Sequence, residues 1–178
     1  MDLANAGVTR RAVDLLQPQP GEFILDAGCG TGAALGEERR RVSCSLTGID
    51  RSAAMIAAAS RSLGEQATLR AGSVEELGSG PTFDGVLLLN VLYFCDADAA
   101  MVRAVHRALK PDGRLVAYVT DRATMQRWSF ARSGFHRLFD RYELADLLAA
   151  GGFAPAQIKV HEEPLAHFVR GLFAVAYR

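Results

Sequence analysis

The hydrophobic pattern alternates between short, continuous apolar runs and longer segments in which apolar residues recur at helical spacing. The short runs predict buried β-strands, and they lie at 22–27, 44–49, 67–71, 83–89 and 114–120. The longer segments predict helices, and they cover 8–16, 31–41, 52–63, 96–109 and 141–150. Strand–helix alternation of this kind is typical of a doubly wound parallel sheet with helices on both faces.

Individual residues support two of these boundaries. Ser52 precedes an alanine-rich helical segment and is a predicted N-cap. Lys110-Pro111-Asp112-Gly113 is a strong turn signal, which we expect to stop the helix over 96–109 before the next strand begins.

The regular alternation ends after residue 120. Residues 121–139 show no clear period, and two further apolar runs follow at 156–161 and 172–177. The connection between those runs is too short for a crossover helix, so they predict an antiparallel pair. The sequence therefore predicts a single α/β domain over 1–178, with a Rossmann-like, mostly parallel seven-stranded sheet and an antiparallel C-terminal strand pair.

Composition narrows the function classes. Lys+Arg and Asp+Glu both total 20, so the formal net charge is zero and no global field attracts nucleic acid or an anionic membrane. No apolar run approaches the roughly 18 residues of a membrane-spanning helix. Residues 1–5 lack the build of a signal peptide, and Cys29, Cys44 and Cys95 show no CxxC spacing. We expect a cytoplasmic protein with reduced cysteines, no metal site and no membrane association.

The most informative segment is the glycine-rich stretch over 23–36. A short apolar run ends in Asp26, and Gly28, Gly30 and Gly32 follow at alternate positions before a helix. Glycines there permit positive φ and let a ligand lie against bare main chain. The helix N-terminus offers unpaired N–H groups that favour a carboxylate or a phosphate. In a doubly wound sheet such a loop lies at the carboxyl ends of the strands, near the switch point.

Two ligand classes use a loop of this kind. One is a dinucleotide, because Gly28-x-Gly30-x-x-Ala33 matches the G-x-G-x-x-G/A fingerprint and an acid follows about 20 residues on. Against a dinucleotide oxidoreductase, the chain has no room for a catalytic domain after the sheet and shows no Tyr-x-x-x-Lys pair. The other ligand class is S-adenosylmethionine.

The chain resembles the class I S-adenosylmethionine-dependent methyltransferases at several ordered places. Asp26-Ala27-Gly28-Cys29-Gly30-Thr31-Gly32 resembles their first motif, D/E-x-G-x-G-x-G. The further matches are the acidic strand end at 48–50, the fourth motif over 83–94, the turn at 109–115, and the late helix and turn over 142–153. Within the family the chain is most similar to small bacterial proteins of the quinone C-methyltransferase type.

The resemblance implies S-adenosylmethionine as cofactor and a set of binding residues. Asp26 would help to hold the loop and the cofactor ammonium, and Asp50 would accept hydrogen bonds from both ribose hydroxyls. Backbone around Gly28 and Gly30 would face the methionyl part. The remaining cofactor-binding candidates are Cys29 and Gly32 in the loop, Arg51, Met55 and Val74 for the adenine wall, Ser73, and Asn90 at the end of the fourth strand. Core packing explains Met55 equally well, and the alternative for Asp50 is an acid at a helix N-terminus.

Ser73 departs from the family pattern. The family often has an acid there, within Gly-Asp-Ala, that accepts from the adenine amino group. Gly72-Ser73-Val74 offers a hydroxyl instead, which can accept but carries no charge.

Tyr93 and His136 are the catalytic candidates. Tyr93 follows the fourth predicted strand, and His136 lies in the irregular segment at the same edge of the sheet. Either side chain can act as a base or orient an acceptor, although methyl transfer from a sulfonium requires mainly positioning. The alternatives are a packing role for Tyr93 and a surface loop position for His136.

We expect the acceptor pocket to be formed mainly by 121–139, with help from the N-terminal segment and 90–94. The irregular segment combines arginines with Trp128, Phe130 and Phe135, which suits an anionic, partly apolar small molecule or stacked RNA bases. An amphipathic lid helix with its arginines in water explains the same pattern. Because the net charge is zero, we do not expect a nucleic-acid substrate.

The sequence thus predicts an S-adenosylmethionine-dependent methyltransferase that acts on a small-molecule acceptor as a monomer or homodimer. The alternatives are an NAD(P)-binding Rossmann oxidoreductase and a non-catalytic S-adenosylmethionine-binding module.

Overall fold

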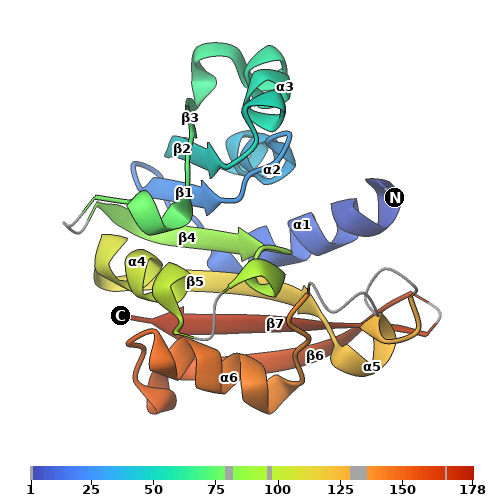
Figure 1. The fold of residues 1–178 in the computed structure, drawn as a ribbon. Coiled ribbons are helices and arrows are strands. Elements are labelled where there is room, and N and C mark those ends of the chain that lie inside the picture. Colours follow the sequence, from blue (N-terminus) through green and yellow to red (C-terminus); the bar gives the residue numbers. More distant parts are fainter. Residues whose placement is uncertain (1, 79–81, 96–97, 129–135, 167) are drawn as a thin grey trace.

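The described residues of the computed structural model (2–78, 82–95, 98–128, 136–166 and 168–178) form one seven-stranded sheet in the order β3-β2-β1-β4-β5-β7-β6 (Figure 1). The strands are β1 (Phe23–Ala27), β2 (Ser45–Asp50), β3 (Thr68–Ala71), β4 (Phe83–Leu89), β5 (Leu109–Thr120), β6 (Ile158–Ala166) and β7 (Val169–Tyr177). The first five run parallel to one another. β7 pairs antiparallel with both β5 and β6. The predicted fold class is therefore confirmed.

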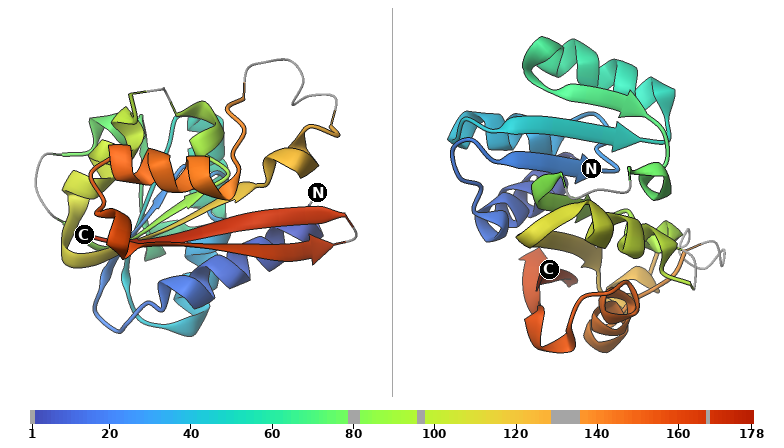
Figure 2. Two further views of the ribbon diagram at one scale, coloured as in Figure 1. Left: turned by 90° about the horizontal axis from the view of Figure 1, so that it is seen from below. Right: turned by 90° about the vertical axis from the view of Figure 1, so that its left-hand side faces the viewer.

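Helices cover both faces of the sheet (Figure 2). They are α1 (Asp2–Leu16), α2 (Ala33–Arg41), α3 (Ala53–Leu63), α4 (Ala100–Ala108), α5 (Arg122–Met125) and α6 (Arg141–Ala150). Buried side chains of α1, α2 and α3 belong to one apolar cluster, and those of α4 and α6 belong to the other. Two cores, one on each face, are what a doubly wound sheet requires.

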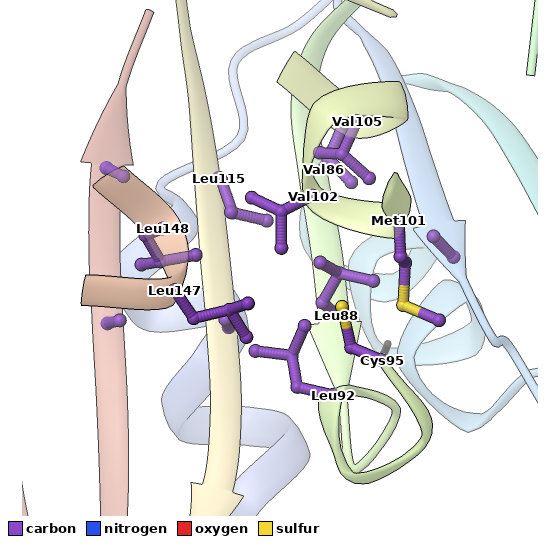
Figure 3. Packing of buried hydrophobic residues seen from close by; sticks show 14 of the residues in the cluster. Val86, Leu88, Leu92, Cys95, Met101, Val102, Val105, Leu115, Leu147 and Leu148 are labelled. Carbon is purple, nitrogen blue, oxygen red and sulfur yellow. The ribbon is translucent and has the colours of Figure 1, made fainter. Parts of the chain in front are cut away.

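Alternate residues of the central strands supply the two cores. In β5, Leu115, Ala117 and Val119 enter the cluster under α4 and α6, whereas Val116 and Tyr118 enter the cluster under α1. The strand period of two directs these side chains to opposite faces, and both faces are covered. Figure 3 shows the packing of α4 and α6 over β4 and β5 through Leu88, Val102, Val105, Leu115, Leu147 and Leu148.

Most predicted elements are confirmed, with differences at their ends. Ser52 caps α3, because its side chain accepts from the amide of Met55 at 3.3 Å. β4 and α6 have the predicted bounds. α1 begins at Asp2 rather than at residue 8, and β6 and β7 extend toward each other to form a long hairpin. Among the described residues, no helix has the length and apolar content that crossing a membrane requires.

The predicted turn at 110–113 lies inside β5 and takes the form of a bulge. Leu109 pairs with Phe83 and Arg114 pairs with Gly85, so four residues of β5 loop out opposite one residue of β4. Asp112 has a φ of 63° within the bulge. The residues of the predicted turn therefore interrupt the hydrogen-bond ladder between β4 and β5 but do not end β5. The strand begins before them, at Leu109, which is fully buried against the core.

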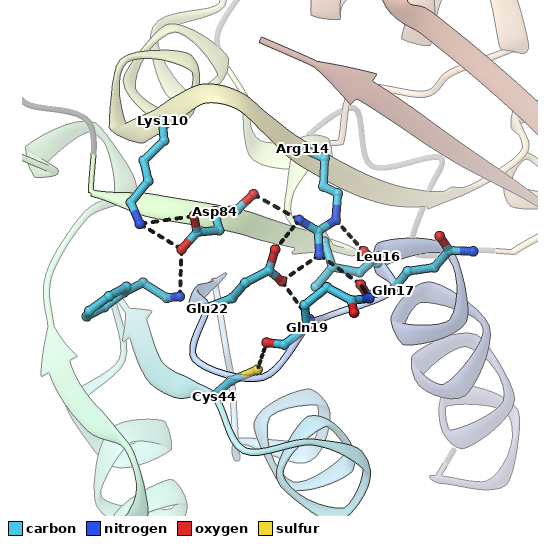
Figure 4. Close-up of polar contacts among 9 residues, drawn as sticks. Leu16, Gln17, Gln19, Glu22, Cys44, Asp84, Lys110 and Arg114 are labelled. Carbon is cyan, nitrogen blue, oxygen red and sulfur yellow. Dashed lines mark hydrogen bonds and ion pairs between the residues drawn. The ribbon is translucent and has the colours of Figure 1, made fainter.

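A network of charged side chains joins α1 to the amino ends of the central strands (Figure 4). The Arg114 guanidinium donates to both oxygens of Glu22, at 2.9 and 2.7 Å, and to the carbonyl of Gln17 at 2.9 Å. It also donates to the carbonyl oxygens of Leu16 and Asp84. Only 13% of the Arg114 side chain and 18% of the Glu22 side chain are exposed. Arg114 therefore satisfies carbonyls at the C-terminus of α1 while it pairs with a largely buried acid.

Glu38 is an unusual buried acid on α2. It is completely buried, and neither carboxyl oxygen has a hydrogen-bond partner in the described part of the chain. Burial, together with the nearby Asp26 carboxyl, raises the pKa of Glu38 well above its usual range. The folded state therefore holds this side chain in its neutral form.

Replacing Arg114 by alanine should lower the free energy of unfolding by about 3 kcal/mol, because the Glu22 carboxylate and several carbonyls lose their donor. Urea unfolding of Arg114→Ala measures this change. Arg40→Ala is the matched control, since Arg40 pairs with Glu37 on the surface and is 63% exposed. A loss of stability no larger than that of the control would contradict the importance of the network.

Glu38 should make the protein less stable as pH rises. Its folded pKa lies above its unfolded value, so the native state binds more protons, and stability falls as pH rises above about 4.3 toward the folded pKa. Glu38→Gln should remove this part of the decline. Thermal unfolding midpoints at about pH 5 and about pH 8 measure the slope, and exposed Glu65→Gln is the control. A variant as pH-sensitive as the wild type would refute this account.

Candidate functional site

A pocket of about 380 Å³ lies where the carboxyl ends of β1, β2, β3 and β4 meet. Its lining residues are Gly28, Asp50, Arg51, Gly72, Val74, Leu89, Asn90, Val91, Phe94 and Met101. Because β1 lies between β2 and β4, this edge of the sheet is the topological switch point at which such folds bind ligands.

Backbone hydrogen bonds hold the glycine-rich loop against β2. The amides of Gly28 and Cys29 both donate to the carbonyl of Ile49, at 2.7 and 3.0 Å. Gly28 has a φ of 87°, and a Cβ at this residue would lie 2.3 Å from Cγ2 of Val91. The first motif glycine is therefore required for its conformation and for the close approach of the loop to the segment after β4.

Asp50 ties the loop to the beginning of α3. Its Oδ2 accepts from the amide of Gly30 at 2.9 Å, and its Oδ1 accepts from the amide of Ser52 at 2.8 Å. Each carboxylate oxygen has a second lone pair, and the carboxylate lines the pocket. Asp50 thus has the helix-terminal role that the sequence analysis considered, at the start of α3. Its carboxylate is also open to a ligand in the pocket.

Asp26 and Cys29 are buried and are not among the residues that line the pocket. Asp26 is 3% exposed, and burial together with the charge of Asp50 raises its pKa to about 7. Cys29 is 7% exposed, and burial raises the pKa of its thiol to about 12, with the Asp26 and Asp50 carboxylates adding to the effect. Such a thiol is a packed, protonated side chain and not a nucleophile.

The remaining loop glycines shape the path of the chain. Gly30 has a φ of 52° and contributes the amide that Asp50 accepts. Gly32 has a φ of 82° and is the residue from which α2 begins. Neither glycine lies on the pocket wall.

A polar cluster borders the pocket beside β2 and β3. Arg51 donates to Oγ of Ser73 at 3.0 Å and pairs with Glu75 at 3.2 Å. The Ser73 hydroxyl in turn donates to the Glu75 carboxylate. Burial raises the pKa of Glu75, but the hydrogen bond from Ser73 and the Arg51 charge outweigh it, so the net shift is downward. The Glu75 carboxylate is therefore a charged hydrogen-bond acceptor. It lies two residues after Ser73, the position where the family often has an acid.

Val74 and Met55 occupy different environments. Val74 is 5% exposed and lines the pocket. Met55 is 43% exposed on the first turn of α3 and does not belong to the wall. Neither apolar core includes Met55, so core packing does not explain this residue.

The β4 side of the pocket is mainly apolar. It is formed by Leu89, Val91, Phe94 and Met101, with Asn90 as the polar exception. Phe94 is 56% exposed, which is uncommon for a large aromatic side chain beside a pocket. The sequence analysis did not single out Gly72, Leu89 or Met101, whereas Val91 and Phe94 lie within the 90–94 segment that it expected beside the acceptor. Leu89 ends a strand and Gly72 follows one, which is a usable signal, whereas Met101 occupies an ordinary apolar position of a helix.

The two catalytic candidates lie beside this apolar wall. Tyr93 is 8% exposed, and its hydroxyl is already bonded to Asn90 and to the amide of Thr120. Burial raises the pKa of Tyr93, which disfavours proton abstraction. The His136 ring packs on Phe94 with centroids 5.3 Å apart and edge-on to Tyr93 at 6.3 Å. Catalytic roles for both remain predictions.

Part of the predicted acceptor segment is outside the described residues, namely 129–135 with Phe130 and Phe135. On either side, Trp128 packs against the core under α4 and α6. Arg122 pairs with Glu143 and donates to the carbonyl of Leu138 at 3.1 Å. This arginine is therefore committed to protein groups rather than held free in water.

Comparisons with known proteins agree with this geometry. The family described as "Methyltransferase domain" matches residues 25–117, which is more than half of the 178 residues. The chain is 34% identical over 116 residues to nocamycin O-methyltransferase of Saccharothrix syringae, covering 61% of this chain and 41% of that protein. It is 34% identical over 122 residues to ubiquinone biosynthesis O-methyltransferase of Methylocella silvestris, covering 66% of this chain and 47% of that protein. The chain thus spans less than half the length of both relatives.

A solved structure shows the same fold over nearly the whole chain. Magnesium protoporphyrin IX methyltransferase of Synechocystis, with bound S-adenosylhomocysteine, superposes with a TM-score of 0.79 at 20% identity and covers 99% of this chain and 84% of that one. The family match, the ordered motifs and the pocket at the switch point lead to one conclusion: the chain belongs to the methyltransferase-domain family of class I S-adenosylmethionine-dependent methyltransferases.

Proposed function

We propose that this protein binds S-adenosylmethionine in the pocket at the ends of β1–β4 and transfers its methyl group to a small-molecule acceptor. The observation that carries the proposal is the convergence of the Gly28 turn, the Asp50 carboxylate and Val74 on one pocket of about 380 Å³. That volume lies within the range of cofactor sites, which is about 300–1,000 Å³.

The residues on the pocket wall fit this cofactor. The Gly28 turn presents bare main chain, as the methionyl part of the cofactor requires. Asp50 retains acceptor capacity on both oxygens, which suits two neighbouring ribose hydroxyls. Val74 provides an apolar surface for a purine, and the Ser73–Glu75 pair lies at the edge of that surface.

The chemistry that the described pocket supports is positioning. A bound S-adenosylmethionine supplies an electrophilic methyl group on its sulfonium. Among the described lining residues, Asp50 and Arg51 are the ionisable ones: Asp50 accepts from two backbone amides, and Arg51 donates to Ser73 and pairs with Glu75. The protein's contribution is therefore to orient the two reactants in line and to exclude water from the reacting atoms.

The acceptor site should lie on the β4 side. Phe94, Val91 and Met101 form an apolar wall, and the His136 ring packs on Phe94. This wall favours a flat, partly apolar acceptor. The names of the two O-methyltransferase relatives support an oxygen atom as the methylated position. A single domain over 1–178, a cytoplasmic location and a monomeric or homodimeric state also belong to this proposal.

Asp50→Ala should weaken binding of S-adenosylhomocysteine by about 2–4 kcal/mol, because two hydrogen bonds from ribose hydroxyls to a charged group are lost. Isothermal titration calorimetry measures the change, and circular dichroism checks that the variant stays folded. Glu65→Ala removes an exposed acid far from the pocket wall and is the control. An affinity for S-adenosylhomocysteine unchanged from wild type would mean that Asp50 only accepts from backbone amides of the protein and does not contact the ribose.

The same titration separates the proposed function from its alternatives. Wild-type protein should bind S-adenosylhomocysteine and not NAD, and it should transfer a labelled methyl group from S-adenosylmethionine to a compound in a metabolite extract. Binding of NAD alone would favour an oxidoreductase. Cofactor binding without any transfer would favour a non-catalytic module.

A further inference from the structure

A chain of hydrogen bonds runs from the pocket wall into the core beside β5. The Tyr93 hydroxyl lies 3.3 Å from Oδ1 of Asn90 and 2.5 Å from the amide nitrogen of Thr120. The Thr120 hydroxyl lies 3.2 Å from the hydroxyl of Tyr118, which is 3% exposed. Of these residues, Asn90 alone lines the pocket.

The direction of the bonds at Tyr93 follows from donor chemistry. A backbone amide can only donate, so the Tyr93 oxygen accepts from Thr120. The hydroxyl in turn donates its single proton to Oδ1 of Asn90 at 3.3 Å. This fixes which end of the Asn90 carboxamide faces Tyr93: the oxygen faces Tyr93, and the amino group faces away from it.

The backbone of Asn90 supports the same arrangement. Its φ is 60°, a left-handed conformation that asparagine tolerates better than most residues. Its amide donates to the carbonyl of Tyr118 at 3.0 Å, which anchors the residue at the end of β4. Within the described part of the chain, no group accepts a hydrogen bond from the Asn90 amino group.

We propose that Tyr93 is a positioning residue that holds the Asn90 amino group toward the pocket, where it donates to an oxygen lone pair of the ligand. The partner is a carboxylate, carbonyl, hydroxyl or phenolate oxygen, carried either by the cofactor or by the methyl acceptor. A protonated amine at this point would be rejected, because donor would face donor. The inference rests on the proposed function. It adds that the pocket beside β4 selects a ligand group that can accept a hydrogen bond.

The test uses three variants of the full chain. Tyr93→Phe removes the hydroxyl that orients Asn90. Asn90→Asp keeps an acceptor for Tyr93 but replaces the amino group by an oxygen. Tyr118→Phe is the matched control, because it also deletes a buried tyrosine hydroxyl of the same network but keeps the Tyr118 carbonyl that accepts from the Asn90 amide.

Two measurements are made on each variant: the Kd of S-adenosylhomocysteine by calorimetry, and the KM for catechol with labelled S-adenosylmethionine. Tyr93→Phe should worsen one of these quantities about 3- to 10-fold, as expected for one hydrogen bond. Asn90→Asp should worsen the same quantity more, and Tyr118→Phe should leave both within about twofold of wild type. A change in Kd assigns the partner oxygen to the cofactor, and a change confined to KM assigns it to the acceptor.

Thermal unfolding separates positioning from structure. Both tyrosine variants should lower the Tm, whereas only Tyr93→Phe should alter Kd or KM. Equal effects of the two tyrosine variants on Kd and KM, or no effect of Asn90→Asp on either, would overturn the proposal. Failure of the wild type to bind S-adenosylhomocysteine would instead overturn the proposed function.

Discussion

The geometry of the pocket depends on the hydrogen bonds that the Asp50 carboxylate accepts. It accepts from the amide of Gly30 in the loop after β1 and from the amide of Ser52 before α3, so one side chain joins two segments that approach each other across the switch point. Ile49 adds to the same junction, since its carbonyl accepts from Gly28 and Cys29. The loop can follow this path only because glycines occupy its left-handed positions. A ligand carboxylate or hydroxyl therefore meets a surface organised before binding.

The pocket joins two unlike surfaces. Beside β2 and β3 it is polar and charged, through Asp50 and through Arg51 with its Ser73–Glu75 partners. Beside β4 it is apolar and aromatic, through Val91, Phe94 and Met101. A cofactor with a hydroxylated sugar suits the first surface, and a flat acceptor suits the second. This division favours catalysis by orientation, since the charged groups of the pocket lie on the side away from the apolar wall.

The opposite end of the sheet has a different role. There Arg114, Glu22, Asp84 and Lys110 connect the end of α1 with β1, β4 and β5, and the Arg114–Glu22 pair of this network is largely shielded from water. Carbonyls that would otherwise be unpaired at the end of α1 obtain their donors from this guanidinium. The charged network thus lies at the amino ends of the strands, and the pocket lies at their carboxyl ends. Burial raises the pKa values of Glu38 and Asp26, so we expect the free energy of unfolding to fall as pH rises.

Local patterns in the sequence determined the strands, the helices, the Ser52 cap, the glycine loop and the place of Asp50 at a strand end, because period, capping and turn chemistry depend on neighbouring residues. They did not determine which side chains share the pocket. Met101 resembles an ordinary apolar position until α4 packs beside β4, and the sequence does not show that the Tyr93 hydroxyl, in the segment after β4, accepts from the amide of Thr120 in β5. Likewise, the sequence does not show that Glu75 meets Ser73 and Arg51 beside the pocket. Contacts between segments distant in sequence depend on how the elements pack, and that information exists only in the tertiary structure.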